Sequence, residues 1–274
     1  MIPFSKQRWL GLTLFIALSA AIVWLYRHYT ADVPRMSYLT GWVLFAVILL
    51  LTIYNGRKKL PFLPLLSSEA WLQFHIYAGL LTGVLFLVHV SCKIPAGWFQ
   101  WILAWLYLLV MVSGFFGLFV SRAVPKRLTT RGGEVLFERI PAIRRQLQEQ
   151  TEALALQSVG EVKSSTIADF YLRELKDFFE GPKNFKAHLF EIRSPLNRLL
   201  NKISDVNRYL NEQERATMDK IAAQVRQKDG LDYHHALQLM VKLWLFVHIP
   251  LTYSLLLFTL AHIVLVFAFS GGAQ

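Results

Sequence analysis

The hydrophobic residues of this chain gather into long runs, and polar residues fill the stretches between them. Five runs reach the length of about 20 residues that an α-helix needs to cross a bilayer. They cover residues 9–26, 38–55, 71–92, 98–120 and 243–269. Aromatic residues such as Trp9, Tyr26 and Trp98 stand near the ends of the runs, as is typical of a membrane interface. The pattern predicts an all-α protein that forms a bundle of five transmembrane helices.

A long charged segment separates the fourth run from the fifth. Residues 122–235 contain 20 Lys/Arg and 16 Asp/Glu, whereas the rest of the chain has nine basic and two acidic residues. Residues that favour the start of a helix (Ser, Thr, Asn and Pro) and glycines that favour its end occur along this segment. They predict helices over 140–156, 164–182, 194–210 and 211–230, the last ending at Gly230. Mixed charge on such helices is typical of solvated faces. We therefore expect three parts: transmembrane helices over 1–121, a soluble helical insert over 122–235, and a fifth transmembrane helix with a short tail over 236–274.

Basic residues near the ends of the runs predict the orientation of the bundle. Basic clusters lie before the first run, after the second and after the fourth, around Lys6, Lys58 and Arg122. In a five-span protein these three places are on the same side of the membrane. Because basic residues collect on the cytoplasmic side, we expect the N-terminus and the insert in the cytoplasm and the C-terminus outside. The net charge of +11 then reflects topology, and we expect membrane lipid as a partner and no nucleic acid. The expected location is the bacterial inner membrane.

Four histidines form a regular pattern within two of the runs. His75 and His89 lie in the third run, His248 and His262 lie in the fifth, and both spacings are fourteen residues. Fourteen residues are nearly four helical turns, so each pair shares a face and is separated by roughly 21 Å along the axis. The third and fifth spans run in the same direction. We therefore expect His75 to face His248 on the inner half and His89 to face His262 on the outer half.

Two imidazoles that face each other across a bundle can hold a haem iron from above and below. Small or hydroxyl-bearing residues near the histidine faces would leave room for the ring, namely Gly79, Thr82, Gly83, Thr252 and Thr259. Haem propionates need basic partners near each surface, and the candidates are Lys58, Arg122 and Lys93. The structural alternative is that the histidines make interhelical hydrogen bonds and that the basic residues only extend toward the membrane surface.

Other metal chemistry finds less support in the sequence. The only cysteine, Cys92, excludes an intrachain disulfide, a Cys-x-x-Cys-His attachment of c-type haem and a four-cysteine metal site within the chain. A metal transporter would need carboxylates along its path, and the interiors of the five runs contain no Asp or Glu. The sequence therefore predicts two b-type haems and no catalytic residue of its own.

The paired histidines on two helices of a bundle resemble the membrane di-haem b-type cytochromes. These include the N-terminal cytochrome b/b6 type, the b561 type and the transmembrane part of ferric reductases. The resemblance implies an electron-transfer subunit of an oxidoreductase complex that passes electrons across the bilayer. It also implies a link to quinone, and redox partners such as a flavoprotein, an iron–sulfur protein or a multihaem cytochrome. The long insert before the fifth run departs from these families, so the donor and acceptor stay open.

Two further functions are left open by the sequence. One is a ferric- or oxygen-reductase type of haem enzyme that receives electrons from a separate flavoprotein. The other is a membrane scaffold without redox chemistry, whose insert recruits partners.

Overall fold

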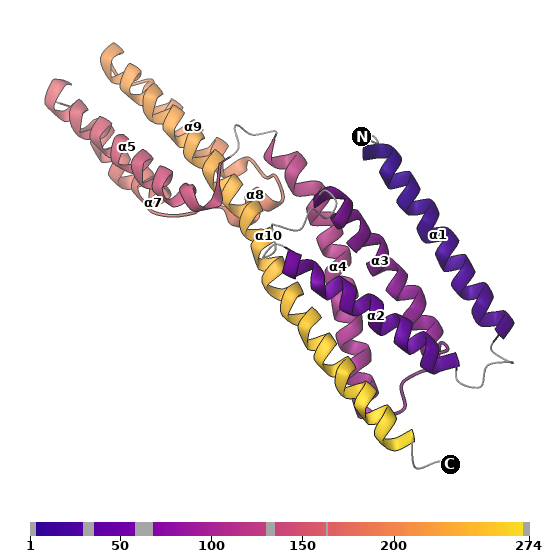
Figure 1. Ribbon diagram of the computed structural model, residues 1–274. Helices are drawn as coiled ribbons and strands as arrows, with labels where there is room; N and C mark the ends of the chain where they lie inside the picture. The colour runs from indigo at the N-terminus through magenta and orange to yellow at the C-terminus, as the bar shows by residue number, and fades with distance from the viewer. Residues whose placement is uncertain (1–3, 30–35, 58–67, 130–134, 163, 271–274) are drawn as a thin grey trace. The chain divides into compact units, whose positions relative to one another are not determined.

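A computed structural model of the chain describes residues 4–29, 36–57, 68–129, 135–162 and 164–270 (Figure 1). All regular structure in these ranges is helical, which confirms the predicted all-α class. The chain divides into two compact units. We call residues 1–119 with 244–274 the membrane unit, and residues 120–243 the helical unit.

Within the described ranges, five helices are long and apolar enough to cross a membrane, as the sequence predicts. Four of them are α1 (Phe4–Tyr29), α2 (Met36–Arg57), α3 (Ser68–His89) and α4 (Trp98–Leu128). The fifth is α10 (Glu212–Ser270), whose final part is its membrane-spanning segment. Large apolar side chains such as Trp9, Phe246 and Phe269 are exposed on these helices, as is typical of helices that face lipid. The protein is therefore an integral membrane protein in contact with lipid.

The interior of the membrane unit joins α2, α3, α4 and α10. Its core residues are Leu44 and Ile48 of α2, Leu85 of α3, Tyr107 of α4 and Leu255 of α10. Aromatic stacking adds contacts between α4 and α10, which lie side by side in Figure 1, as in the pair Phe99–Phe258 with ring centroids 5.9 Å apart.

Helix α1 packs on α3, where Gly11 leaves room for the ring of Tyr77. The hydroxyl of Tyr26 donates to Ser91 Oγ just beyond the end of α3. Helix α3 ends at His89, three residues before the end of the predicted run, because Ser91 and Cys92 adopt left-handed φ angles of 52° and 53°. His89 therefore lies at the very end of its helix.

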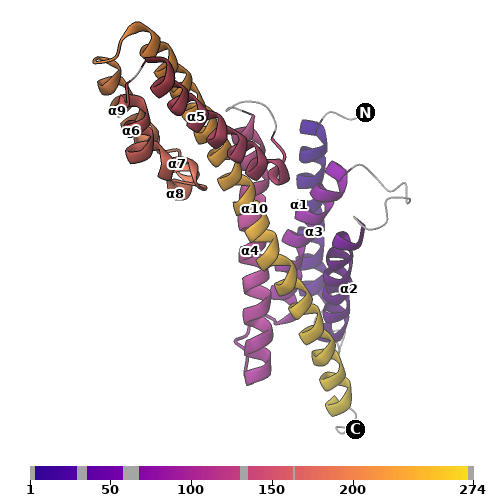
Figure 2. The ribbon, with the colours of Figure 1, turned by 90° about the vertical axis from the view of Figure 1, so that its left-hand side faces the viewer.

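The helical unit, whose helices are drawn in Figure 2, has a hydrophobic core of its own. Its elements are η1 (Phe137–Arg139), α5 (Ile140–Val162), α6 (Thr166–Phe170), the π-helical turn η2 (Tyr171–Leu175), α7 (Lys176–Phe179), α8 (Phe185–Leu189) and α9 (Ser194–Asn207). Parts of α4 and α10 complete it. Helix α5 lies beside the first part of α10, where Thr151 donates to Gln224 at 2.7 Å. Ile140, Ile167 and Met218 are completely buried.

The predicted end of a helix at Gly230 is wrong. Helix α10 is continuous over 59 residues from Glu212 to Ser270, so the expected boundary between 235 and 236 falls inside a helix. A mid-helix glycine costs about 1 kcal/mol relative to alanine. The neighbouring side chains Leu231, Tyr233 and Leu237 are buried, and their packing outweighs that cost.

Helix α10 begins with a reciprocal cap. The backbone N–H of Glu214 donates to Asn211 Oδ1 at 2.9 Å, and the backbone N–H of Asn211 donates to Glu214 Oε2 at 3.0 Å. These bonds satisfy donors that a helix start leaves without intrahelical partners. At about 1.5 Å per residue, α10 is far longer than a bilayer is thick, so only its apolar residues from 243 onward can lie in lipid.

Candidate functional site

The predicted outer histidine pair meets in the structure. His89 at the end of α3 and His262 on α10 have ring centroids 6.5 Å apart and ring planes at 86°. Nδ1 of His89 lies 3.1 Å from the carbonyl oxygen of Ser37 on α2. A carbonyl only accepts hydrogen bonds, so a neutral His89 carries its proton on Nδ1. Its Nε2 then has a free lone pair that can bind a metal.

A cavity of about 390 Å³ adjoins this pair. Its lining comes from α2, α3, α4 and α10 and is mostly apolar; it includes Leu44, Phe86, Tyr107, Thr259 and both histidines. Phe86 and Tyr107 stack with ring centroids 4.2 Å apart. The site therefore places two imidazoles at the edge of an apolar space between four helices.

Gly41 of α2 is part of the same wall. A Cβ atom at this position would lie 2.9 Å from Cε1 of His89, which is closer than real Cβ contacts allow. Only glycine lets the imidazole pass so near the α2 backbone. Gly41 thus lets the ring of His89 lie against α2, one turn from the Ser37 carbonyl that accepts its hydrogen bond.

The predicted inner pair has no ring contact like that of the outer pair among the described contacts. His75 of α3 lies within electrostatic range of His248 of α10. Nδ1 of His248 lies 3.1 Å from Ser113 Oγ on α4, so here a side-chain hydroxyl takes the place of the carbonyl at the outer pair. The outer pair is therefore in ring contact, as parallel helices with equal spacing predict, and the inner pair lies within electrostatic range on the same two helices.

The small residues of α3 contribute unequally to the inner site. Gly79, one turn from His75, has open space where a side chain would begin, with no atom within 4 Å of a Cβ atom. At Gly83 the methyl group of Met111 would lie 3.2 Å from such an atom, so the side chain of Met111 already occupies this space. Clearance for a flat ring therefore exists at Gly79.

The predicted threonines satisfy their hydroxyls within their own helices. Thr82 donates to Gly79 O at 2.6 Å and accepts from the hydroxyl of Tyr107 at 3.1 Å. Thr252 donates to His248 O at 2.8 Å, and Thr259 donates to Leu255 O at 2.7 Å. Each bond to a carbonyl satisfies the hydroxyl donor within its own helix, and Thr82 also links α3 to Tyr107 of α4.

The predicted propionate partners are not assembled around the histidines by any described contact. Lys58 lies outside the described residues. Lys93 is exposed in the turn that follows α3, four residues beyond His89. Arg122 is exposed on the part of α4 that belongs to the helical unit.

The donor set of the outer pair fits a haem iron. Metal–imidazole bonds are about 2 Å long, so two imidazoles on one iron have ring centroids about 6 Å apart; His89 and His262 are 6.5 Å apart. A porphyrin supplies four nitrogens, and two imidazoles complete the coordination. Among the described residues no three His, Cys, Asp or Glu side chains gather to enclose a bare metal ion. Anchored Nδ1 atoms are also usual for histidines that bind metals.

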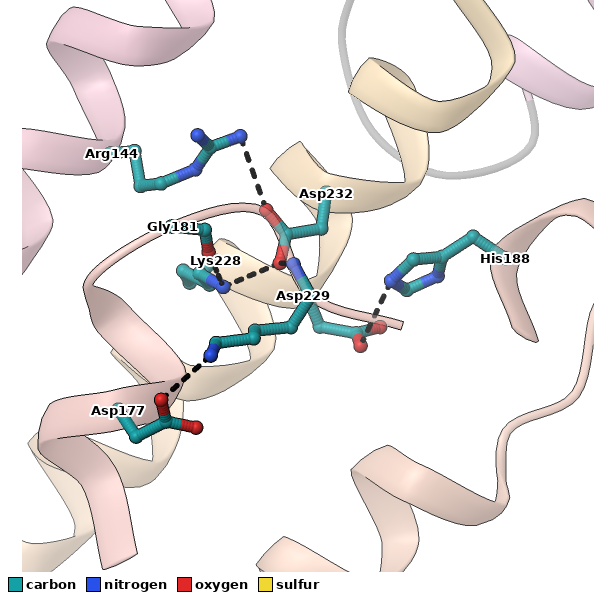
Figure 3. Close-up of polar contacts among 8 residues, drawn as sticks. Arg144, Asp177, Gly181, His188, Lys228, Asp229 and Asp232 are labelled. Carbon is teal, nitrogen blue, oxygen red and sulfur yellow. Dashed lines mark hydrogen bonds and ion pairs between the residues drawn. The ribbon is translucent and has the colours of Figure 1, made fainter. Parts of the chain in front are cut away.

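A second polar cluster lies in the helical unit (Figure 3). Lys228, which is completely buried, donates to Asp232 Oδ2 at 2.5 Å and to Gly181 O at 2.8 Å. Arg144 lies 3.3 Å from Asp232 Oδ1, and the backbone N–H of Lys183 donates to Asp232 Oδ2 at 3.0 Å. Asp232 therefore links α5, the loop after α7 and α10.

The same cluster is balanced in charge. Asp229 lies 3.7 Å from Nε2 of His188, so two carboxylates accompany the two cations Lys228 and Arg144. Buried charges are tolerated when they are paired and hydrogen-bonded in this way. These groups link α5, the loop after α7, α8 and α10, and removing one partner would leave a buried charge uncompensated.

Tyr171 and Glu138 are among the ionisable groups outside this cluster whose pKa values are shifted. Burial raises the pKa of Tyr171, and the carboxylates of Glu152 and Glu180 raise it further. A hydrogen bond from Lys242, at 3.0 Å, lowers the pKa of Glu138. Neither group belongs to a histidine pair.

Sequence reasoning missed Ser37, Gly41, Ser113 and Trp244 as parts of the site. Ser37 and Gly41 lie on α2, and Ser113 lies on α4, and neither helix contains a histidine that draws attention to them. Trp244 has the position of an ordinary interfacial aromatic residue, yet its ring stacks on His248 with centroids 5.4 Å apart. Their roles depend on which helices are neighbours, and the sequence pattern does not contain that information.

Known proteins offer no guide to this site. No protein-family model, curated protein or solved structure matches the chain. The geometry of the two imidazole pairs is therefore the observation on which a function can be based.

Proposed function

We propose that this protein is a di-haem b-type cytochrome that passes electrons across the membrane. The observation that carries the proposal is the outer pair. The ring centroids of His89 and His262 lie 6.5 Å apart between four apolar helices. Nδ1 of His89 donates a hydrogen bond to the backbone carbonyl of Ser37. At this separation both imidazoles could hold one haem iron. The inner pair lies on the same two helices with the same spacing of fourteen residues.

The residues divide the work between two sites. His75 and His248 would hold the inner haem, and His89 and His262 the outer one, about 21 Å apart along the helices. Bound haem supplies one-electron chemistry, its iron alternating between the ferric and ferrous states. The apolar walls exclude water, and the α2 carbonyl and the α4 hydroxyl orient the imidazoles. An electron given by a reduced partner at one face can then leave to an oxidised partner at the other.

The wider setting belongs to the same proposal. The basic flanks favour an N-terminus and a helical unit on the cytoplasmic side of a bacterial inner membrane. The chain would then be the membrane subunit of a redox complex. A flavoprotein, an iron–sulfur protein, a multihaem cytochrome or quinol would give or take its electrons.

The haem content of the purified full chain tests the proposal. We expect a b-type spectrum after reduction with dithionite and two haems per chain by pyridine haemochrome analysis. His89→Ala and His262→Ala should each lower the ratio from two to one. His28→Ala is the matched control, because His28 is an exposed histidine of the same unit that stacks on Trp24, and it should leave two haems. A wild-type protein without haem would refute the proposal, as would two haems in both variants.

The open space at Gly79 gives a second test. Gly79→Leu fills that space without meeting a protein atom near its Cβ, so we expect an unchanged helical circular dichroism spectrum and loss of the inner haem only. Gly114→Leu is the matched control, since Gly114 of α4 has equally open surroundings. If both variants keep two haems, the inner site does not lie against Gly79.

A further inference from the structure

We infer that Ser113 is a positioning residue that orients His248 and sets the electron-donating strength of its ring toward the inner iron. The inference rests on the proposed function, because it concerns the ligand of a haem. Its starting point is the distance of 3.1 Å between Ser113 Oγ and Nδ1 of His248. Ser113 lies on α4, which carries neither histidine pair, so it acts on the iron only through the ring.

Ser113 is itself held in place from α10. The indole N–H of Trp244 donates to the carbonyl oxygen of Ser113 at 2.9 Å. The ring of Trp244 also stacks on His248, with centroids 5.4 Å apart and planes at 30°. One tryptophan therefore contacts both partners of the serine–histidine hydrogen bond. This double contact fixes the serine and the imidazole relative to each other.

The surface of α4 is shaped for this tryptophan. Gly117, one turn beyond Ser113, is buried, and a Cβ atom there would overlap the indole ring of Trp244. The absence of a side chain lets the indole lie directly on the α4 backbone. Gly117, Trp244 and Ser113 thus form one arrangement whose end point is Nδ1 of His248.

The chemistry of imidazole gives this arrangement a consequence. A neutral histidine that binds iron through Nε2 has its proton on Nδ1, so Ser113 Oγ must accept it. Giving that proton a hydrogen-bond acceptor makes the ring a stronger electron donor, which favours ferric over ferrous iron. Removal of the acceptor should therefore raise the midpoint potential of the inner haem.

The outer pair offers a built-in comparison. Nδ1 of His89 donates to the backbone carbonyl of Ser37, and no side-chain substitution at position 37 removes that acceptor. At the inner pair the acceptor is a side chain. Equivalent serine substitutions at the two sites should therefore have different effects.

Redox titration of the full chain, followed by its visible spectrum, tests the role of Ser113. We expect Ser113→Ala to raise one of the two midpoint potentials and leave the other unchanged. Ser113→Thr keeps a hydroxyl and should preserve both potentials. Ser37→Ala should also preserve both, because its carbonyl stays. Loss of one haem in Ser113→Ala, with two retained in Ser113→Thr, would equally support the positioning role.

Other outcomes separate this inference from the proposed function. If Ser113→Ala keeps two haems with both potentials unmoved, or if Ser113→Thr changes as much as Ser113→Ala, Ser113 has no such role, although the protein is still a di-haem cytochrome. An upward shift of the same potential in Ser37→Ala would contradict it as well. A wild-type chain without haem would overturn the proposed function and the role of Ser113 together.

Discussion

The buried carboxylate of Asp232 should be among the most sensitive positions for the stability of the helical unit. Its side chain and that of Lys228 are 1% and 0% exposed, and Arg144 lies on its other oxygen. Asp232→Asn keeps the shape and can still accept from the Lys183 N–H, but it leaves two cations without their shared counter-charge. Removing one partner of a buried ion pair costs about 3–5 kcal/mol. For a protein of this size that corresponds to a melting temperature lower by about 10 °C.

The assay is thermal unfolding of the full chain in detergent, followed by circular dichroism, with a surface pair as the control. Lys202 and Glu174 are 2.6 Å apart but 55% and 36% exposed, so Glu174→Gln should cost at most about 1 kcal/mol. Adding Lys228→Met to Asp232→Asn removes one of the uncompensated cations and should recover part of the loss, which a double-mutant cycle measures. Equal losses for Asp232→Asn and Glu174→Gln, or no recovery in the double variant, would refute the reasoning.

Three further predictions concern other positions. Tyr171→Phe should stabilise the protein by about 1 kcal/mol, because the buried hydroxyl has no hydrogen-bond partner among the described residues. Burial raises the pKa of Tyr171, so the unfolded chain loses the phenolic proton first as the pH rises. The stability difference between Tyr171→Phe and the wild type should therefore grow above about pH 10. Melting curves at pH 8 and pH 10.5 check this. Gly41→Ala should push the His89 ring aside and lower the haem ratio from two to one, with the inner haem retained. Glu214→Ala should cost about 1 kcal/mol in denaturant unfolding by removing half of the α10 cap, and an unchanged unfolding midpoint would contradict this.

The transmembrane helices and the pairing of the histidines could be predicted because each depends on a simple geometric rule. Run length identifies the spans, and α3 and α10 run in the same direction because one span separates them. With equal spacing on both helices, the pairing of His89 with His262 requires no knowledge of side-chain contacts. The continuity of α10 past Gly230 could not be predicted, because glycine is a local stop signal and the packing of Tyr233 and Leu237 that overrides it is tertiary.

The polar parts of both units escaped prediction for a related reason. Lys228 and Asp232 are four residues apart on a helix, a spacing that usually indicates a surface ion pair, yet both are buried. Ser113 on α4 and Gly41 on α2 gain their roles only from the imidazoles that another helix brings to them. A sequence pattern describes each helix separately and contains no such partner.

The glycines that lie beneath rings have a consequence for how the bundle is assembled. In each case a glycine of one helix receives the ring of another: Gly11 receives Tyr77, Gly41 receives His89, and Gly117 receives Trp244. Lipid gives helices little hydrophobic reason to associate, so close packing of this kind decides how far one helix slides along the next. Two of these contacts pack α3 against α1 and α2, and the third packs α10 against α4. The position of each histidine-bearing helix along the bundle is therefore fixed by a neighbouring helix that carries none of the four paired histidines. These glycine–ring contacts therefore help to set the levels at which the four imidazoles lie in the membrane unit.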